Sequence, residues 1–89
     1  MTAQVIKVKY YHDAGHGWVA VKRNLLRESG LEKEISAFSY QKGQTVYLEE
    51  DCDAYKFEKA MKAKGYVFEV DNRYCERSPI RSYASYFTV

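Results

Sequence analysis

The N-terminal part of the chain alternates apolar and polar side chains. Between residues 5 and 11 apolar side chains occupy every second position, and Lys7 and Lys9 lie between them. A period of two predicts a half-buried strand. The turn-forming segment Asp-Ala-Gly-His-Gly at 13–17 leads into the apolar run 18–21. We therefore expect the two runs to form a β-hairpin.

A short helix and a second hairpin are predicted next. Residues 24–29 favour a helix that ends at Gly30, because glycine adopts the left-handed conformation that a helix C-terminus needs. Segments 37–40 and 45–48 flank Gln-Lys-Gly-Gln at 41–44, which is typical of a β-turn with a glycine at positive φ.

The clearest helical pattern lies at residues 54–64, where apolar side chains recur at helical spacing before Gly65. Asp51 or Asp53 is expected to cap its N-terminus. The alternating segment 66–70 predicts another strand, the polar residues 71–73 a turn, and residues 83–88 an edge strand.

The elements follow the order β-β-α-β-β-α-β, with a further strand at the end. This order predicts a small α+β fold in which an antiparallel-rich sheet of four to six strands carries two helices on one face. With 89 residues, we expect one domain spanning residues 1–89. A sheet this small leaves an edge strand open, so homodimerisation is a further expectation.

Composition narrows the classes of function. The net charge of +2 is too small to indicate a general polyanion-binding domain. No segment has the length or apolarity of a membrane span or a signal peptide, so we expect no membrane partner and a protein that stays in the cytoplasm of the cell that makes it. In that compartment Cys52 and Cys75 are expected as thiols.

Residues for catalysis or metal binding do not occur in a recognisable pattern. The only candidate for a catalytic cysteine with a histidine base is Cys52 with His12 or His16. The carboxylates around Cys52 disfavour its thiolate, so we expect a small buried thiol at this position instead. No Cys-x-x-Cys or His-Glu-x-x-His motif is present. We therefore expect a non-enzymatic protein with no cofactor and no metal.

Three segments are candidates for binding a partner. The loop Gly-His-Gly-Trp at 15–18 suits close contact, although a lone tryptophan is more often a core anchor. The acidic heptapeptide 47–53 is either a helix start or a surface for a basic groove. The chain has nine tyrosines, which suit either a sheet or an interface, and two of them, Tyr74 and Tyr83, lie in the arginine-rich segment 73–83. The candidate partner-binding residues are His16, Trp18, Tyr47, Glu49, Glu50, Asp51, Asp53, Arg77, Arg81 and Tyr83.

Several short motifs occur together along the chain: His-Asp at 12–13 with Gly-His-Gly-Trp at 15–18, Ser-Tyr at 39–40 with Gly43, Tyr-Leu-Glu-Glu-Asp-Cys-Asp at 47–53, and Ser-Pro-Ile-Arg-Ser-Tyr at 78–83. This combination resembles a family of small uncharacterised proteins of bacteriophages, prophages and plasmids. The resemblance covers nearly the whole chain and brings no activity or cofactor with it. It implies an accessory protein that binds and blocks a host protein, including components of CRISPR or restriction systems.

Two hypotheses therefore stand at this point. The first is a protein-binding module that inhibits a host defence complex, with tyrosines as anchors and charged patches for steering. The alternative is a nucleic-acid-binding accessory protein that uses Arg73, Arg77 and Arg81 together with the neighbouring tyrosines.

Overall fold

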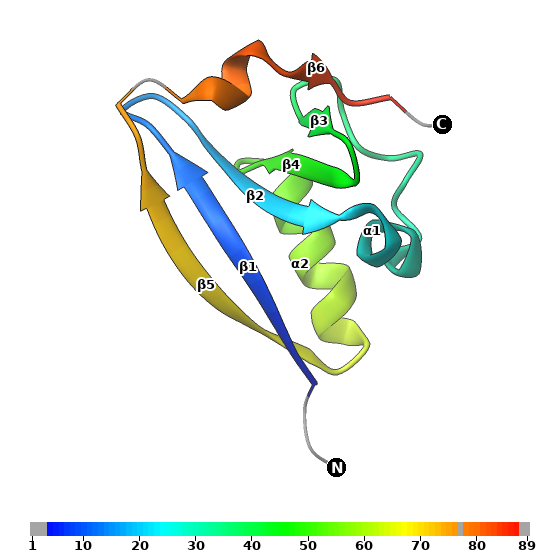
Figure 1. Cartoon of the computed structure of the whole chain (residues 1–89). Helices are drawn as coiled ribbons and strands as arrows, with labels where there is room; N and C mark the ends of the chain where they lie inside the picture. Colours follow the sequence, from blue (N-terminus) through cyan, green and yellow to red (C-terminus); the bar gives the residue numbers. More distant parts are fainter. Residues whose placement is uncertain (1–3, 77, 88–89) are drawn as a thin grey trace.

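A single sheet runs through the molecule, with one long helix behind it (Figure 1). The computed structural model describes residues 4–76 and 78–87. The elements in chain order are β1 (Gln4–His12), β2 (Gly17–Lys22), α1 (Arg23–Ser29), β3 (Tyr40–Lys42), β4 (Thr45–Glu49), α2 (Asp53–Ala63), β5 (Tyr66–Tyr74), the 3₁₀ turn η1 (Pro79–Ser82) and β6 (Ala84–Ser85). The strands lie side by side in the order β5-β1-β2-β4-β3-β6. The predicted α+β class is confirmed.

The sheet is mixed, although antiparallel pairs predominate. β1 pairs antiparallel with β2, and β4 pairs antiparallel with both β2 and β3. β5 lies parallel to the other edge of β1, because the chain crosses behind the sheet through α2 before it returns. The turn predicted at 71–73 is wrong, since β5 continues along β1 until Tyr74 pairs with His12.

Glycines end α1 and turn the second hairpin as predicted. Gly30 has a φ of 78° after α1, and Gly43 has a φ of 60° between β3 and β4. The helix start at α2 differs from the prediction. Cys52 occupies the cap position without a side-chain cap, and the Glu49 carboxylate accepts hydrogen bonds from the backbone N–H of Asp51 and of Cys52. A carboxylate at the end of β4 therefore provides hydrogen-bond acceptors for the backbone N–H groups of the turn that leads into the helix.

The hydrophobic core lies between the sheet and the two helices. Phe57 of α2 is 1% exposed and meets Phe68 of β5 edge to face, with ring centroids 5.9 Å apart. The buried residues of this core are Ile6, Val8, Val21, Leu26, Val46, Leu48, Ala54, Phe57, Met61 and Tyr86. Each large side chain buried here stabilises the fold by roughly 1.5–3 kcal/mol. Within the described residues, neither helix has the length and apolarity to cross a lipid bilayer.

The C-terminal segment closes the sheet beside β3. β6 pairs with β3, and the Tyr86 N–H donates to the carbonyl of Ser39 at 2.8 Å. The edge strand predicted at 83–88 is thus present as a shorter strand, and Thr88 lies outside the described residues. Figure 1 shows η1 and β6 running along the end of the sheet at which β1 and β5 finish and β2 begins.

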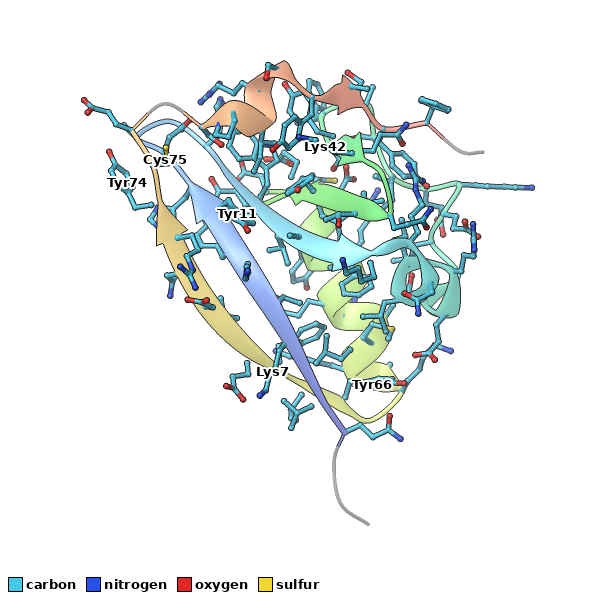
Figure 2. All side chains as sticks on the ribbon, viewed as in Figure 1. Lys7, Tyr11, Lys42, Tyr66, Tyr74 and Cys75 are labelled. Atoms are coloured by element: carbon cyan, nitrogen blue, oxygen red, sulfur yellow. The ribbon has the colours of Figure 1, made fainter. Side chains whose placement is uncertain are left out.

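Side chains on the face of the sheet opposite α2 form a second layer, which we call the open face. Along β1, Lys7, Lys9 and Tyr11 alternate with the core residues and point to this face. Figure 2 labels Lys7 and Tyr11 along β1 and Lys42 on β3. The open face is therefore rich in lysine and tyrosine.

Candidate functional site

Segments that are far apart in the sequence meet at one end of the molecule. The Asp13 carboxylate accepts hydrogen bonds from the backbone N–H of Gly15 and of His16, each at 2.9 Å. It also forms an ion pair with Arg81 of η1, with an Nε to Oδ2 distance of 2.7 Å and an Nη2 to Oδ1 distance of 3.0 Å. The Arg81 hydrogen bonds and those of the turn hold the Asp13 pKa well below its usual range. The loop after β1 is thus fixed to the C-terminal segment.

Trp18 is buried beneath this ion pair. It is 2% exposed, and the Arg81 guanidinium carbon lies 5.4 Å from the centroid of its ring. Tyr40 of β3 meets the same ring edge to face at 6.0 Å. Trp18 is outside the core between sheet and helices, because its strand position faces the other side of the sheet. The expectation of a buried tryptophan is confirmed, but Trp18 anchors the C-terminal segment and lies apart from the main core.

A pocket of about 420 Å³ opens beside Trp18, and we call it the Trp18 pocket. Five residues that the sequence assigned to a partner surface line it: His16, Trp18, Glu49, Asp51 and Arg81. Its remaining lining residues are Ala37, Phe38, Tyr40 and Cys52. The pocket therefore combines aromatic walls with carboxylates and a guanidinium.

Phe38 and Tyr40 were not among the sequence-based candidates. Phe38 is 77% exposed, which is unusual for phenylalanine in a folded domain. It lies in a tight turn, where the Ser39 N–H donates to the carbonyl of Ser36 and the Phe38 N–H donates to the Ser36 hydroxyl. The pattern Ala-Phe-Ser-Tyr predicts a strand at 37–40 and gives no indication of a binding site. In the structure the strand begins only at Tyr40, which leaves Phe38 in the turn before it.

Asp53 has an internal role. It is fully buried, and its Oδ2 accepts hydrogen bonds from the Ser36 N–H at 3.0 Å, the Ser36 hydroxyl at 2.6 Å and the Ser39 hydroxyl at 2.6 Å. The Ser39 hydroxyl in turn accepts the Glu49 N–H at 2.9 Å. This network joins the Phe38 turn to α2 and β4, so Asp53 shapes the pocket from inside and presents no surface to a partner.

Glu50 is also engaged within the protein. The Tyr10 hydroxyl donates a hydrogen bond to its carboxylate. Burial and then this bond raise the pKa of Tyr10 to about 12. Gly17 makes the contact feasible, because a Cβ at this position would overlap the Tyr10 ring. The second glycine of the Gly-His-Gly-Trp loop is thus required by packing.

Tyr47 and Tyr83 lie together on the open face, and neither of them lines the Trp18 pocket. Their ring centroids are 5.2 Å apart, and Tyr11 of β1 is 6.0 Å from Tyr47. The Lys42 ammonium lies 4.8 Å from the centroid of Tyr83. Burial and the neighbouring tyrosines raise the pKa of Tyr47. The structure therefore divides the predicted surface into the Trp18 pocket and a separate row of tyrosines.

The arginines predicted to hold nucleic acid are partly occupied. Arg73 forms an ion pair with Asp71 at 2.7 Å, and Arg81 is held by Asp13. Arg77 lies outside the described residues. The paired guanidiniums have fewer donors left for phosphate than the sequence pattern indicated.

The Cys52 thiol is exposed at the pocket, so the expectation of a small buried thiol at this position is wrong. The cap position of α2 faces solvent, which leaves this side chain outside the core. Among the described residues, no three histidine, cysteine, aspartate or glutamate side chains gather in a way that could hold a metal ion.

Comparisons of the chain with protein-family models, with curated proteins and with solved structures found no match.

Proposed function

We propose that this chain is a small non-enzymatic protein-binding module that holds its partner at the Trp18 pocket. The observation that carries the proposal is the exposed Phe38 side chain at a pocket that all three segments predicted to bind a partner help to line. Aromatic side chains next to a recess are typical anchors of protein interfaces. Phe38 would insert into the partner, and the pocket would receive an apolar side chain in return.

Charges around the pocket would set the orientation of the partner. Glu49 and Asp51 contribute carboxylates to the lining, while Arg81 contributes a guanidinium. A partner with complementary charges would dock in one register, and such charges affect specificity and association rate more than affinity.

The resemblance to small proteins of phages and plasmids directs the choice of partner. On that basis we propose that the chain acts as an inhibitor of a host defence complex, such as a CRISPR or restriction system. The proposal of nucleic-acid binding through Arg73, Arg77 and Arg81 has less support, because Asp71 and Asp13 already accept the donors of two of these arginines.

The test is an affinity pull-down from bacterial host lysate, treated with nuclease, followed by mass spectrometry. The baits are the unchanged chain, Phe38→Ser and the matched control Phe87→Ser, whose phenylalanine is also exposed, at 58%, but is not part of the pocket. Removing the ring should weaken binding by about 10- to 100-fold, as expected for one large apolar side chain.

A discrete protein that the unchanged chain and Phe87→Ser capture, and that Phe38→Ser loses, would agree with the proposal. Equal capture by all three baits, or recovery only without nuclease, would contradict it.

A further inference from the structure

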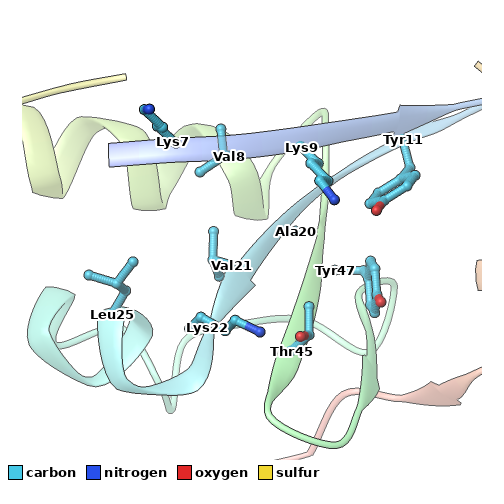
Figure 3. A pocket seen from close by; sticks show the side chains of 10 residues that line it. All are labelled: Lys7, Val8, Lys9, Tyr11, Ala20, Val21, Lys22, Leu25, Thr45 and Tyr47. Carbon is cyan, nitrogen blue, oxygen red and sulfur yellow. The ribbon is translucent and has the colours of Figure 1, made fainter. Parts of the chain in front are cut away.

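A hollow of about 260 Å³ lies in the open face and shares no lining residue with the Trp18 pocket (Figure 3). Its floor is Ala20 of β2, which is paired with Lys9 of β1 on one side and with Tyr47 of β4 on the other. Residues paired across strands point to the same face of a sheet. A methyl group between two long side chains therefore leaves an open space.

The polar lining of this hollow is cationic. Lys7, Lys9 and Lys22 border it, and no carboxylate is among its lining residues. Figure 3 shows the ammonium groups of Lys9 and Lys22 on either side of Ala20. Within the described part of the chain none of these three lysines forms an ion pair.

Acidic residues do lie nearby, on the outer strand. Glu69 and Asp71 of β5 are in register with Lys7 and Lys9. Asp71 is already held by Arg73 through two hydrogen bonds, at 2.7 and 2.9 Å. Both carboxylates lie across β1 from the hollow and border a neighbouring recess together with Lys7 and Lys9. Among the described residues no ion pair joins them to these lysines.

Tyrosines border the hollow toward η1. Tyr11 and Tyr47 lie 6.0 Å apart with their ring planes at 60°, and both rings are half-buried. Figure 3 shows them together at one end of the hollow, beyond Lys9 and Ala20. Tyr83 and Lys42 continue the same alternation of ring and ammonium across β4 and β3. Half-buried rings held by neighbouring rings are rigid platforms on which a flat group can stack.

We propose that the open face binds single-stranded nucleic acid. Lys7, Lys9 and Lys22 would contact the phosphates, and an unpaired base would stack on Tyr11 and Tyr47. Stacking requires a base whose face is free, which a single strand offers and a duplex conceals. This surface is distinct from the Trp18 pocket, and it uses none of the arginines of the C-terminal segment.

The test is fluorescence anisotropy with labelled 20-nucleotide oligo(dT), oligo(U) and a DNA duplex, measured between 25 and 200 mM salt. Three lysine–phosphate contacts to a single strand should give a slope of log affinity against log salt of about −2. The double variant Lys9→Ala/Lys22→Ala should reduce the size of that slope by about 1.4. The matched control Lys59→Ala/Lys64→Ala removes the same charge from exposed positions on and just after α2, behind the sheet, and should leave the slope unchanged.

The contribution of stacking is tested separately. Tyr11→Leu should weaken single-strand binding by about 5- to 100-fold, whereas Tyr11→Phe keeps the ring and should bind like the unchanged chain. Preference for oligo(U) over oligo(dT) would assign the surface to RNA, and the reverse would assign it to DNA.

The proposal is overturned if the chain does not bind single strands at 25 mM salt, if it prefers the duplex, or if the two lysine double variants behave alike. It is independent of the protein-binding proposal. Phe38→Ser should bind the oligonucleotides normally, and Lys9→Ala/Lys22→Ala should still capture a protein held at the Trp18 pocket.

Discussion

Replacing Ser39 by alanine tests whether the buried network behind Phe38 stabilises the fold. Ser39 and Asp53 are each 0% exposed, and the Ser39 hydroxyl connects the Asp53 carboxylate to the Glu49 N–H. The other oxygen of Asp53 is buried without a partner among the described residues. The carboxylate therefore depends on the donors at Oδ2, and the loss of one of them is poorly compensated.

The expected loss of unfolding free energy follows from the two hydrogen bonds that Ser39→Ala removes. A hydrogen bond to a carboxylate contributes roughly 1.5–3 kcal/mol, and the part-buried Glu49 N–H left without an acceptor costs about 1 kcal/mol or more. Ser39→Ala should thus lower the free energy of unfolding by about 2.5–4 kcal/mol, with the two Ser36 bonds limiting the loss. An 89-residue domain is expected to have only about 4–13 kcal/mol in total.

Urea unfolding, followed by far-ultraviolet circular dichroism and by Trp18 fluorescence, measures this change. The midpoint should fall while the slope of the unfolding free energy against urea stays constant, because the folded surface is unchanged. Ser82→Ala is the control, since this exposed hydroxyl donates to the nearby carbonyl of Pro79 and bonds no other group among the described residues. A loss below about 1 kcal/mol for Ser39→Ala, or a loss equal to that of Ser82→Ala, would refute the reasoning.

Three further predictions concern titration and assembly. Tyr10 should ionise with a pKa of about 12 in an ultraviolet titration, and Glu50→Gln should lower that pKa. Because folding raises the pKa of Tyr10, the stabilisation of the fold by this protonated hydroxyl is present below about pH 10 and is lost as the pH rises through 12. An ordinary tyrosine pKa in the titration would contradict the Tyr10–Glu50 contact. Folding lowers the pKa of Asp13, so the stabilisation of the fold by this carboxylate is present above about pH 4 and is lost on acidification. Arg81→Ala should move the midpoint of acid unfolding to higher pH, and an unchanged midpoint would count against the ion pair. β5 forms an open edge of the sheet and Val70 on it is 51% exposed, so the chain should form homodimers through this edge at high concentration. Val70→Lys should disrupt these dimers. Light scattering that gives the mass of one chain at all concentrations would exclude this pairing.

Much of the fold could be predicted because its signals are local. The alternation around Lys7 and Lys9, the turn at Gly43 and the apolar spacing of α2 each report the conformation of their own segment. The parallel pairing of β1 with β5 has no local signal. Residues 71–73 have the composition of a turn, yet the long pairing with β1 keeps them extended.

The candidate site was predictable by residue type but not by position. His16, Glu49 and Arg81 were selected from separate motifs, and only the folded chain shows that they line one pocket. Asp53 was selected for its charge, and its burial depends on Ser36 and Ser39, which precede it by more than a dozen residues. Long-range contacts of this kind leave no periodic pattern in the sequence.

The parallel pairing of β1 with β5 also determines when the sheet can be completed during protein synthesis. β1 leaves the ribosome before β5, yet its partner on one side extends to Tyr74. Until that residue emerges, the nascent chain carries a strand with one row of unpaired backbone groups, next to a core that lacks Phe68. Pairings so distant in sequence form slowly. Truncations that remove β5 should therefore leave an aggregation-prone hairpin, and a chain that ends after Tyr74 retains the whole β5-β1-β2-β4 arrangement.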